Sequence, residues 1–271
     1  MIFQVAYGCP SNSCCFCRMY KGVKYHKRDR NELSAEIRKA GAHYPETGRV
    51  FLADGDVMDF SFEELKGILE ELNEAFPKLA RVNVYANGSS ILEKSEAELA
   101  ELHRLKLNTL YVGLESGDEE VLTLVRKSET AADMIKAVNL AQGVGLKCSV
   151  MVLLGIGGKK YSMRHVVNTA AAVNLMQPRL LSALRFIEVA GTLMYKEYES
   201  ITEYEAVSEL RELVYNLDLK KTVFRANHAS NPVPLGGRFP QDREKLLGEI
   251  DYMLKSGRLD EKGPGHVPIY L

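Results

Sequence analysis

Several features that would narrow the function at once are missing from this 271-residue chain. No apolar run reaches the roughly 18 to 20 residues that a membrane-spanning helix needs. The first residues, MIFQVAYG, lack the basic region and long apolar core of a signal peptide. Lys plus Arg (35) nearly balances Asp plus Glu (36), and the net charge of −1 gives no electrostatic reason to expect nucleic acid or an anionic membrane as the partner. We therefore expect a cytoplasmic protein that acts on a small molecule or a peptide.

Cysteine is also scarce, yet four of the five cysteines lie between Cys9 and Cys17, in the stretch GCPSNSCCFC. A reducing compartment disfavours structural disulfides, so a tight cysteine cluster there favours metal binding or catalysis. No second C-x-x-C pair and no H-x3-H pair occurs elsewhere in the chain. A tetrahedral zinc site would therefore need His26 as its fourth protein ligand.

Short β-rich runs alternate with segments of helical periodicity along the chain. Six strand–helix repeats at about 30-residue spacing predict right-handed βαβ units and a parallel sheet. Three helices begin with a capping box, in which a Ser or Thr and a Glu three residues later bond each other's backbone N–H groups. The predicted strands cover residues 2–7, 49–54, 81–87, 109–116, 147–155 and 180–189, and the capping boxes are Ser61/Glu64, Ser95/Glu98 and Thr202/Glu205.

The last quarter of the chain predicts one more strand at 222–228, a helix at 240–254 and a Gly/Pro-rich tail without regular structure. No low-complexity linker or composition break interrupts the sequence, so we expect a single domain over residues 1–271. Its core would be residues 1–200, closed by the extension at 201–271. The periodicity alone is compatible with an open doubly wound sheet and with a full or partial barrel.

Cys9, Cys14 and Cys17 are spaced C-x4-C-x2-C directly after the first predicted strand. In a parallel αβ architecture this C-terminal edge of the sheet is where sites form, and three thiolates on one loop can hold one inorganic centre. A [4Fe–4S] cluster usually takes four cysteines, so a cluster here would keep one iron without a cysteine ligand. Cys15 breaks the spacing, and Cys148 lies far from the loop, so we expect both to be buried structural thiols.

The stretch GCPSNSCCFC resembles the cluster loop of the radical S-adenosylmethionine (radical SAM) enzymes, including the aromatic Phe16 before the last cysteine. The commonest spacing in that superfamily is C-x3-C-x2-C, and this chain has one more residue in the first gap. The resemblance implies an α/β fold, a partial (βα)6 TIM-like barrel of parallel strands with a C-terminal strand and helix extension. It also implies an oxidoreductase that binds one [4Fe–4S] cluster through Cys9, Cys14 and Cys17.

Other strand ends resemble the segments with which this superfamily binds SAM. Asp54, Gly55 and Asp56 stand where a Gly-Gly-Glu-like segment binds the amino group, although a plain turn would also explain them. Glu115 matches the residue that contacts the ribose and Lys127 the one that holds the carboxylate, although a lysine in a short helix often faces water. The expected SAM contacts are Phe16, Asp54, Gly55, Asp56, Asn87, Glu115, Lys127, Gly155 and Ile156.

The resemblance implies a mechanism in which SAM chelates the open iron and an electron from a flavodoxin- or ferredoxin-type donor breaks the sulfonium C–S bond. The resulting 5′-deoxyadenosyl radical takes hydrogen from a substrate that the sequence does not identify. The polar candidates to face that substrate are Asp56, Arg185, Glu188 and His228.

Two alternatives stay open at this point. One is a non-catalytic iron–sulfur or zinc protein that uses the loop for electron transfer, and the other is a SAM-sensing or vestigial homologue. We expect neither nucleic acid nor a membrane among the partners.

Overall fold

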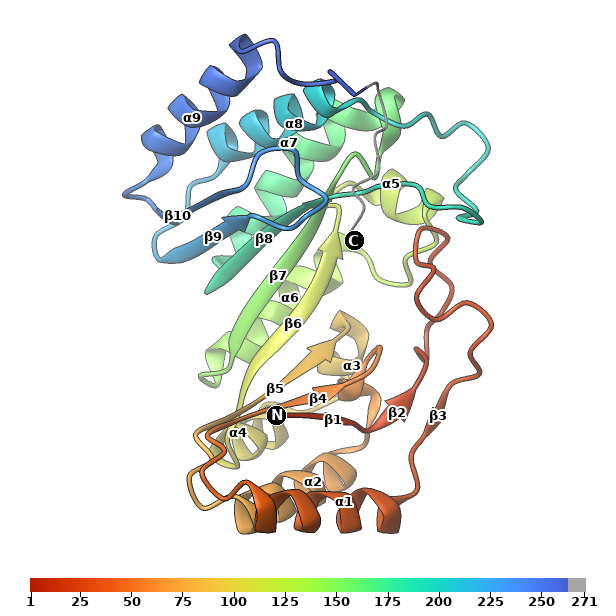
Figure 1. Cartoon of the computed structure of the whole chain (residues 1–271), viewed down its shortest axis with the longest axis vertical. Coiled ribbons are helices and arrows are strands. Elements are labelled where there is room, and N and C mark those ends of the chain that lie inside the picture. The colour runs from red at the N-terminus through yellow and green to blue at the C-terminus, as the bar shows by residue number, and fades with distance from the viewer. Residues whose placement is uncertain (263–271) are drawn as a thin grey trace. The chain divides into compact units, whose positions relative to one another are not determined.

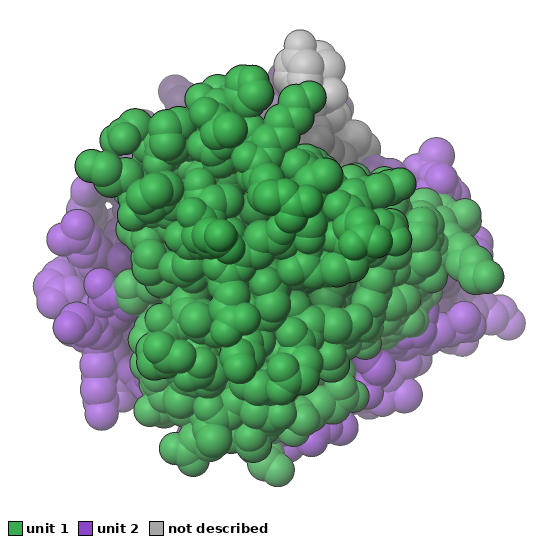
Figure 2. Space-filling view, turned by 90° about the horizontal axis from the view of Figure 1, so that it is seen from below, with its two compact units in different colours: residues 1–12, 19–112, 136–148 green, residues 13–18, 113–135, 149–271 purple. Residues whose placement is uncertain are grey.

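The computed structural model describes residues 1–262 and divides into two compact units, coloured green and purple in Figure 2. The first unit contains residues 1–12, 19–112 and 136–148. The second contains residues 13–18, 113–135 and the described residues from 149 onward. The predicted C-terminal tail lies outside the described residues from position 263, and the single-domain organisation stays a prediction.

The first unit is built on parallel strands in the order β1-β4-β5-β6 (Figure 1). Along these strands buried residues alternate with partly exposed ones, as expected for strands that have one face covered by helices. The strands are β1 Ile2–Gln4, β4 Arg49–Ala53, β5 Arg81–Ala86 and β6 Leu107–Glu115, and a separate antiparallel pair is formed by β2 Ala6–Tyr7 and β3 His26–Lys27. The predicted strand over 2–7 is therefore interrupted at Val5, where the chain leaves the main sheet.

The helices of the first unit include α1 and α2, which run side by side (Figure 1). Helix α2 buries Leu65, Ile68, Leu69 and Leu72, the apolar stripe that its periodicity predicts. The elements are α1 Arg30–His43, the short 3₁₀ helix η1 Val57–Asp59, α2 Phe62–Ala75, α3 Gly88–Leu92, α4 Glu96–Arg104 and α6 Ala131–Gly143, the last of which begins in the second unit.

The second unit continues with parallel strands β7, β8 and β9, and β10 pairs antiparallel with β9. Helices α7, α8 and α9 lie next to one another in this unit (Figure 1). The elements are α5 Glu119–Leu124, β7 Lys147–Leu154, α7 Gly158–Met176, β8 Leu180–Arg185, α8 Glu203–Asn216, β9 Thr222–Ala226, β10 Leu235–Phe239 and α9 Arg243–Lys255.

The strands of this part differ from the sequence prediction in one boundary and in one additional strand. Strand β8 ends at Arg185, four residues earlier than expected, and the extension holds a second strand, β10, that was not predicted. Two glycines, Gly236 and Gly237, weaken the strand signal of β10, and its pairing with β9 provides the stabilisation that its local sequence lacks.

The parallel α/β architecture is confirmed, and so are all three capping boxes, in which the hydroxyl and the carboxylate bond opposite backbone N–H groups. Among residues 1–262, no helix is long and apolar enough to cross a membrane.

Candidate functional site

The cluster loop leaves the first unit at Gly8 and Cys9, next to the end of β4. The backbone N–H of Gly8 donates to Oδ2 of Asp54 at 2.9 Å, and the N–H of Gly55 donates to the Gly8 carbonyl at 3.2 Å. Asp54 has a φ of +135°, which is uncommon for a residue with a side chain. The carboxylate of Asp54, predicted to contact SAM, therefore holds the start of the cysteine loop.

Gly55 lies directly against Cys9. A Cβ added at Gly55 would lie 2.6 Å from Cβ of Cys9 and 2.8 Å from its Cα, closer than non-bonded atoms approach. Only a glycine at this position allows the first cysteine of the loop to sit where it does. The sequence prediction attributed the glycine to a close approach of a ligand, and the structure shows a close approach of the loop itself.

The part of the loop in the second unit carries Cys14, Cys15 and Cys17. The N–H of Cys15 donates to the carbonyl of Val125 at 3.0 Å, and its side chain is 7% exposed. It packs in an apolar cluster with Val125 and Ile156, and Phe16 lies against the same cluster. Cys15 is thus the small buried residue that was predicted, and it anchors the loop between its two neighbouring thiols.

Cys14 lies among charged groups that come from the end of β6 and the segment after α5. Burial is the main influence on its thiol and raises its pKa to about 11, with Glu115 adding to the effect and Lys127 opposing it. Lys127 is 6% exposed at its side chain, and its Nζ lies 3.5 Å from Oε2 of Glu129, whose side chain is 2% exposed. The lysine does not face water.

Lys127 and the two carboxylates form a buried group with one excess negative charge. Burial opposes the charged form of Lys127, but Glu115 and Glu129 outweigh it and raise the pKa of the ammonium. Burial also raises the pKa of Glu115, against the lowering effect of Lys127. Glu129 was not recognised in the sequence, because a single glutamate after a short helix carries no distinguishing pattern.

Glu115 ends β6 with a φ of +61°, a left-handed conformation that non-glycine residues seldom adopt. Its carboxylate folds back over Gly113, where any Cβ would collide with Oε1. In the part of the chain that the structure describes, no hydrogen bond reaches this carboxylate. The strand end thus presents a half-buried, unbonded carboxylate beside Lys127.

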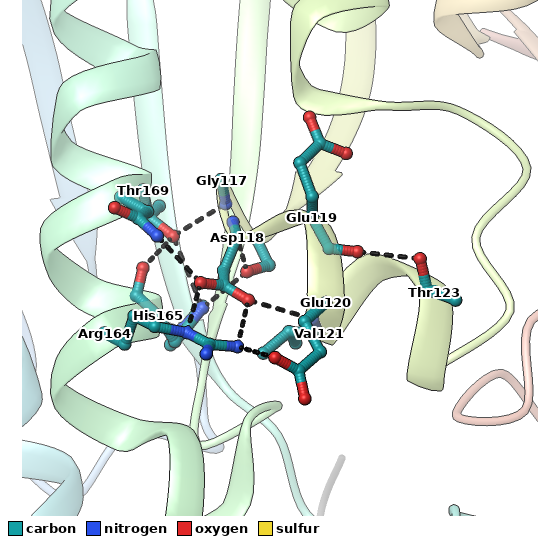
Figure 3. A network of polar contacts seen from close by, with 11 residues as sticks. Gly117, Asp118, Glu119, Glu120, Val121, Thr123, Arg164, His165 and Thr169 are labelled. Carbon is teal, nitrogen blue, oxygen red and sulfur yellow. Dashed lines mark hydrogen bonds and ion pairs between the residues drawn. The ribbon is translucent and has the colours of Figure 1, made fainter.

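A network of polar contacts holds the segment that follows Glu115 (Figure 3). The carboxylate of Asp118 accepts hydrogen bonds from Arg164, at 2.7 and 2.9 Å, and from the backbone of Val121, which caps α5. Oγ of Ser116 lies 2.7 Å from Nδ1 of His165, and burial lowers the pKa of this histidine to about 4. The network ties the end of β6 to helix α7, and His165 is part of it as a neutral, buried ring.

Gly155 and Ile156, two of the predicted SAM contacts, follow β7. The N–H of Gly155 donates to Oε2 of Glu209 at 2.6 Å, and its carbonyl accepts from the hydroxyl of Tyr198 at 3.1 Å. Burial raises the pKa of Glu209 to about 7. Ile156 is fully buried in the cluster around Cys15. A buried acid on α8 therefore fixes the backbone of this turn, a pairing across 54 residues that the sequence does not reveal.

Asp56 and Asn87 lie together in the first unit. Oδ2 of Asp56 accepts from the hydroxyl of Ser90 at 2.6 Å, and Oδ1 accepts from the N–H of Asn87 at 3.3 Å. Asn87 is the residue before α3, and Asp56 is 2% exposed. These contacts show Asp56 bonded to the start of α3, and its predicted contacts with SAM and substrate stay predictions.

The remaining substrate candidates differ in exposure. Arg185 is 5% exposed, with Nη1 3.8 Å from Glu203 and Nη2 3.4 Å from the carbonyl of Ile201, so it holds the segment that follows β8. Glu188 and His228 are exposed. Nδ1 of His228 lies 3.2 Å from the backbone N of Ser230, whose N–H donates to it.

Three aromatic rings that the sequence analysis did not single out stand together in the first unit. Phe51, Tyr85 and Tyr111 come from β4, β5 and β6, and their ring centroids are 5.0 to 5.9 Å apart in edge-to-face pairs. They alternate with the buried residues Leu52, Val84 and Leu110, so they lie on the opposite face of the strands. Tyr85 is 39% exposed.

The donor set of the loop fits an iron–sulfur cluster. Cys9, Cys14 and Cys17 are partly exposed free thiols, and thiolate sulfur is the ligand that such clusters take. Among residues 1–262, no three His, Cys, Asp or Glu side chains stand close enough together to bind a metal ion. Cys9 belongs to the first unit, and Cys14 and Cys17 belong to the second.

The sequence matches the radical SAM superfamily over residues 3–172, more than half of the chain, so the protein belongs to that superfamily. Its cofactors are accordingly a [4Fe–4S] cluster and SAM. An uncharacterized protein from Methanocaldococcus jannaschii is 24% identical over 242 residues, which are 79% of this chain and 45% of that protein.

The tRNA uridine(34) acetyltransferase of Methanocaldococcus infernus is 23% identical over 171 residues, or 60% of this chain and 32% of that enzyme. The chain thus spans less than half the length of the curated relatives it matches.

Among solved structures, the FeFe-hydrogenase maturase HydG from Carboxydothermus hydrogenoformans superposes with a TM-score of 0.54 at 18% identity, covering 92% of this chain and 56% of that one. Coproporphyrinogen III oxidase (HemN) from Escherichia coli, a radical SAM enzyme, gives 0.53 at 14% identity and covers 94% of this chain and 52% of that one. The similarity confirms the predicted fold class, the TIM-like barrel fold of radical SAM proteins.

Proposed function

We propose that this chain is a radical SAM enzyme that holds one [4Fe–4S] cluster through Cys9, Cys14 and Cys17 and cleaves SAM beside it. When bound, the cluster supplies the electron that breaks the sulfonium C–S bond, giving methionine and a 5′-deoxyadenosyl radical that takes hydrogen from the substrate. The observation that carries this proposal is the buried group around Cys14. An ammonium and a carboxylate that accepts no hydrogen bond from the described residues lie near a cluster cysteine, and they suit the carboxylate and the ribose hydroxyls of SAM.

Each residue of the group has a separate task in this proposal. Lys127 binds the carboxylate of SAM, and its burial strengthens the ion pair because little water screens it. Glu115 accepts a hydrogen bond from the ribose. Glu129 holds the Lys127 ammonium in place and keeps it charged. In the other unit, Asp54 and Gly55 position Cys9.

The substrate in this proposal is a small molecule or a peptide that rests on the partly exposed aromatic face of Phe51, Tyr85 and Tyr111. Aromatic side chains contribute most to binding where they are large, rigid and accessible, as Tyr85 is. The electron donor is a low-potential protein of the flavodoxin or ferredoxin type.

The test is formation of 5′-deoxyadenosine. The protein is purified without oxygen, reconstituted with iron and sulfide, and mixed with SAM and dithionite, and the product is quantified by mass spectrometry. We expect product from wild type and from Cys148→Ala, which removes a fully buried thiol outside the loop, and none from Cys17→Ala. A loaded cluster in wild type without 5′-deoxyadenosine would instead support the non-catalytic electron-transfer protein.

A further inference from the structure

A cavity of the second unit lies at the strand edge opposite to Gly155 and Ile156, two of the predicted SAM contacts. It measures about 670 Å³ and opens beside the starts of β8 and β9 and the end of β10, which is antiparallel to them. Gly155 and Arg185 mark the other edge of the same unit, at the ends of β7 and β8. A strand of six residues such as β8 spans roughly 17 Å, so about that distance separates the cavity from the strand ends at Gly155 and Arg185.

The lining of this cavity is strongly basic. Arg179 precedes β8, Lys220 and Lys221 precede β9, and Arg238 stands in β10. All four are exposed, and among the residues that the structure describes none has a carboxylate within ion-pairing distance. The lining includes one carboxylate, Asp242, whose Oδ2 accepts the backbone N–H of Arg238 at 2.8 Å.

This concentration of charge needs an explanation in a chain whose net charge is −1. Several lysines and arginines elsewhere in the chain form ion pairs, such as Lys159 with Glu199 and Arg211 with Asp251. Cations gathered around one cavity repel one another and destabilise the folded chain unless negative charge is brought to them. Four cations against one carboxylate leave three positive charges for a bound anion to neutralise.

The backbone that carries these cations is firmly held. Nη1 of Arg179 donates to the carbonyl of Lys221 at 3.3 Å, and the N–H of Lys220 donates to Oε1 of Gln177 at 3.0 Å. The hydroxyl of Thr222 donates to the carbonyl of Pro178 at 2.6 Å. Because the two strand starts are bonded to each other, the backbone positions that carry the cations are fixed relative to one another, which lowers the part of the entropic cost of binding that backbone ordering would add.

We propose that this cavity binds a small phosphate-bearing molecule with at least two negative charges, such as one that carries a diphosphate group. Arginine matches the geometry of phosphate oxygens with two parallel N–H groups, and the paired lysines add point charges. Helix α9 begins at the cavity wall, after Asp242, and its N-terminal dipole adds to the positive potential. The volume falls in the range of small-molecule sites, roughly 300 to 1,000 Å³.

The test uses inorganic pyrophosphate as the probe and isothermal titration calorimetry at low salt. The variant Lys221→Ala/Arg238→Ala should bind at least about tenfold more weakly than wild type, which corresponds to the loss of about 1.4 kcal/mol. The control, Lys39→Ala/Lys136→Ala, removes the same charge from two exposed lysines on α1 and α6 and should bind like wild type. The binding should weaken from 20 to 200 mM NaCl, as for any charge-driven site.

A second variant, Lys220→Ala/Lys221→Ala, changes two exposed side chains only and keeps the test valid if Arg238 proves necessary for folding. Circular dichroism checks that both variants are folded. No saturable binding of pyrophosphate to wild type, or an equal loss in the control, would overturn the proposal. Binding of a single-stranded RNA oligonucleotide without binding of pyrophosphate would overturn it as well, because the ligand would then be a nucleic-acid backbone. The proposal does not depend on SAM cleavage.

Discussion

Two carboxylates at strand ends, Asp54 after β4 and Glu115 at the end of β6, differ in what their side chains do. Both have positive φ values and both were predicted to contact SAM. The carboxylate of Asp54 is bonded to the backbone of Gly8 and holds the cysteine loop, whereas that of Glu115 accepts no hydrogen bond from the described residues and lies beside Lys127. One strand end thus positions a cysteine, whereas the carboxylate at the other is available to a ligand.

The largest effect is expected from Lys127→Met, which removes the buried ammonium that lies 3.5 Å from the carboxylate of Glu129. Removing one partner of a buried ion pair costs about 3 to 5 kcal/mol. The free energy of unfolding, measured by urea denaturation, should therefore fall by a similar amount. Adding Glu129→Gln should restore most of the stability but not SAM binding. If the double variant binds SAM like wild type, Lys127 has a structural role only.

Glu209 is another carboxylate with a structural role, and its pKa should make the stability of the fold depend on pH. Its pKa is raised to about 7 in the folded chain, so the folded protein binds more protons than the unfolded chain between about pH 4.5 and 7. Its contribution to stability is therefore complete below that window and is lost as the pH rises through 7, on the order of 3 kcal/mol in all. This loss should be absent in Glu209→Gln. The melting temperature of the variant should therefore fall less between pH 5 and pH 7.5 than the melting temperature of wild type. An unchanged pH dependence would contradict the assignment.

Glu115→Gln tests the proposed contact between the carboxylate of Glu115 and SAM. Loss of a charged hydrogen-bond acceptor costs about 1.5 to 3 kcal/mol, so kcat/KM for SAM cleavage should fall about 10- to 100-fold. The iron content of the reconstituted protein should stay at the wild-type level, since Glu115 does not hold the loop. Equal losses of iron and activity would place Glu115 with Asp54 as a positioning residue.

Gly55→Ala tests the contact with Cys9. The added methyl group would lie 2.6 Å from Cβ of Cys9, and a displacement of the loop or a strain of about 1 to 3 kcal/mol should follow. We expect less iron per chain after reconstitution, measured colorimetrically. Gly143→Ala is the matched control, because no atom lies within 4 Å of the added methyl group. Full iron loading of Gly55→Ala would show that the loop adapts.

Asp54→Ala should have the smallest effect of the set. It removes the acceptor for the Gly8 N–H, at a cost of about 1 to 2 kcal/mol, and should lower iron content while leaving the KM for SAM of the loaded fraction unchanged. Asp54→Asn keeps an oxygen acceptor and should recover most of the iron. A raised KM in the loaded fraction would assign Asp54 to SAM after all.

Much of the fold was predictable because its signals are local. A capping box such as Ser61 with Glu64 involves residues three apart, and the alternating burial of β4 and the buried run in β7 follow from the local pattern of apolar residues. Strand β10 was missed because its pairing with β9, rather than its own glycine-containing sequence, stabilises it.

The sequence by itself determined the cysteine spacing, the order of strands and helices and the membership of the radical SAM superfamily. Tertiary structure alone decided what each polar side chain does, since contacts such as Glu209 with Gly155 join residues 54 positions apart. It also decided where charge gathers, because the net charge of a chain contains no information about the distribution of that charge. The basic cavity around Arg179 and Arg238 arises only where the strands bring distant cations to one edge.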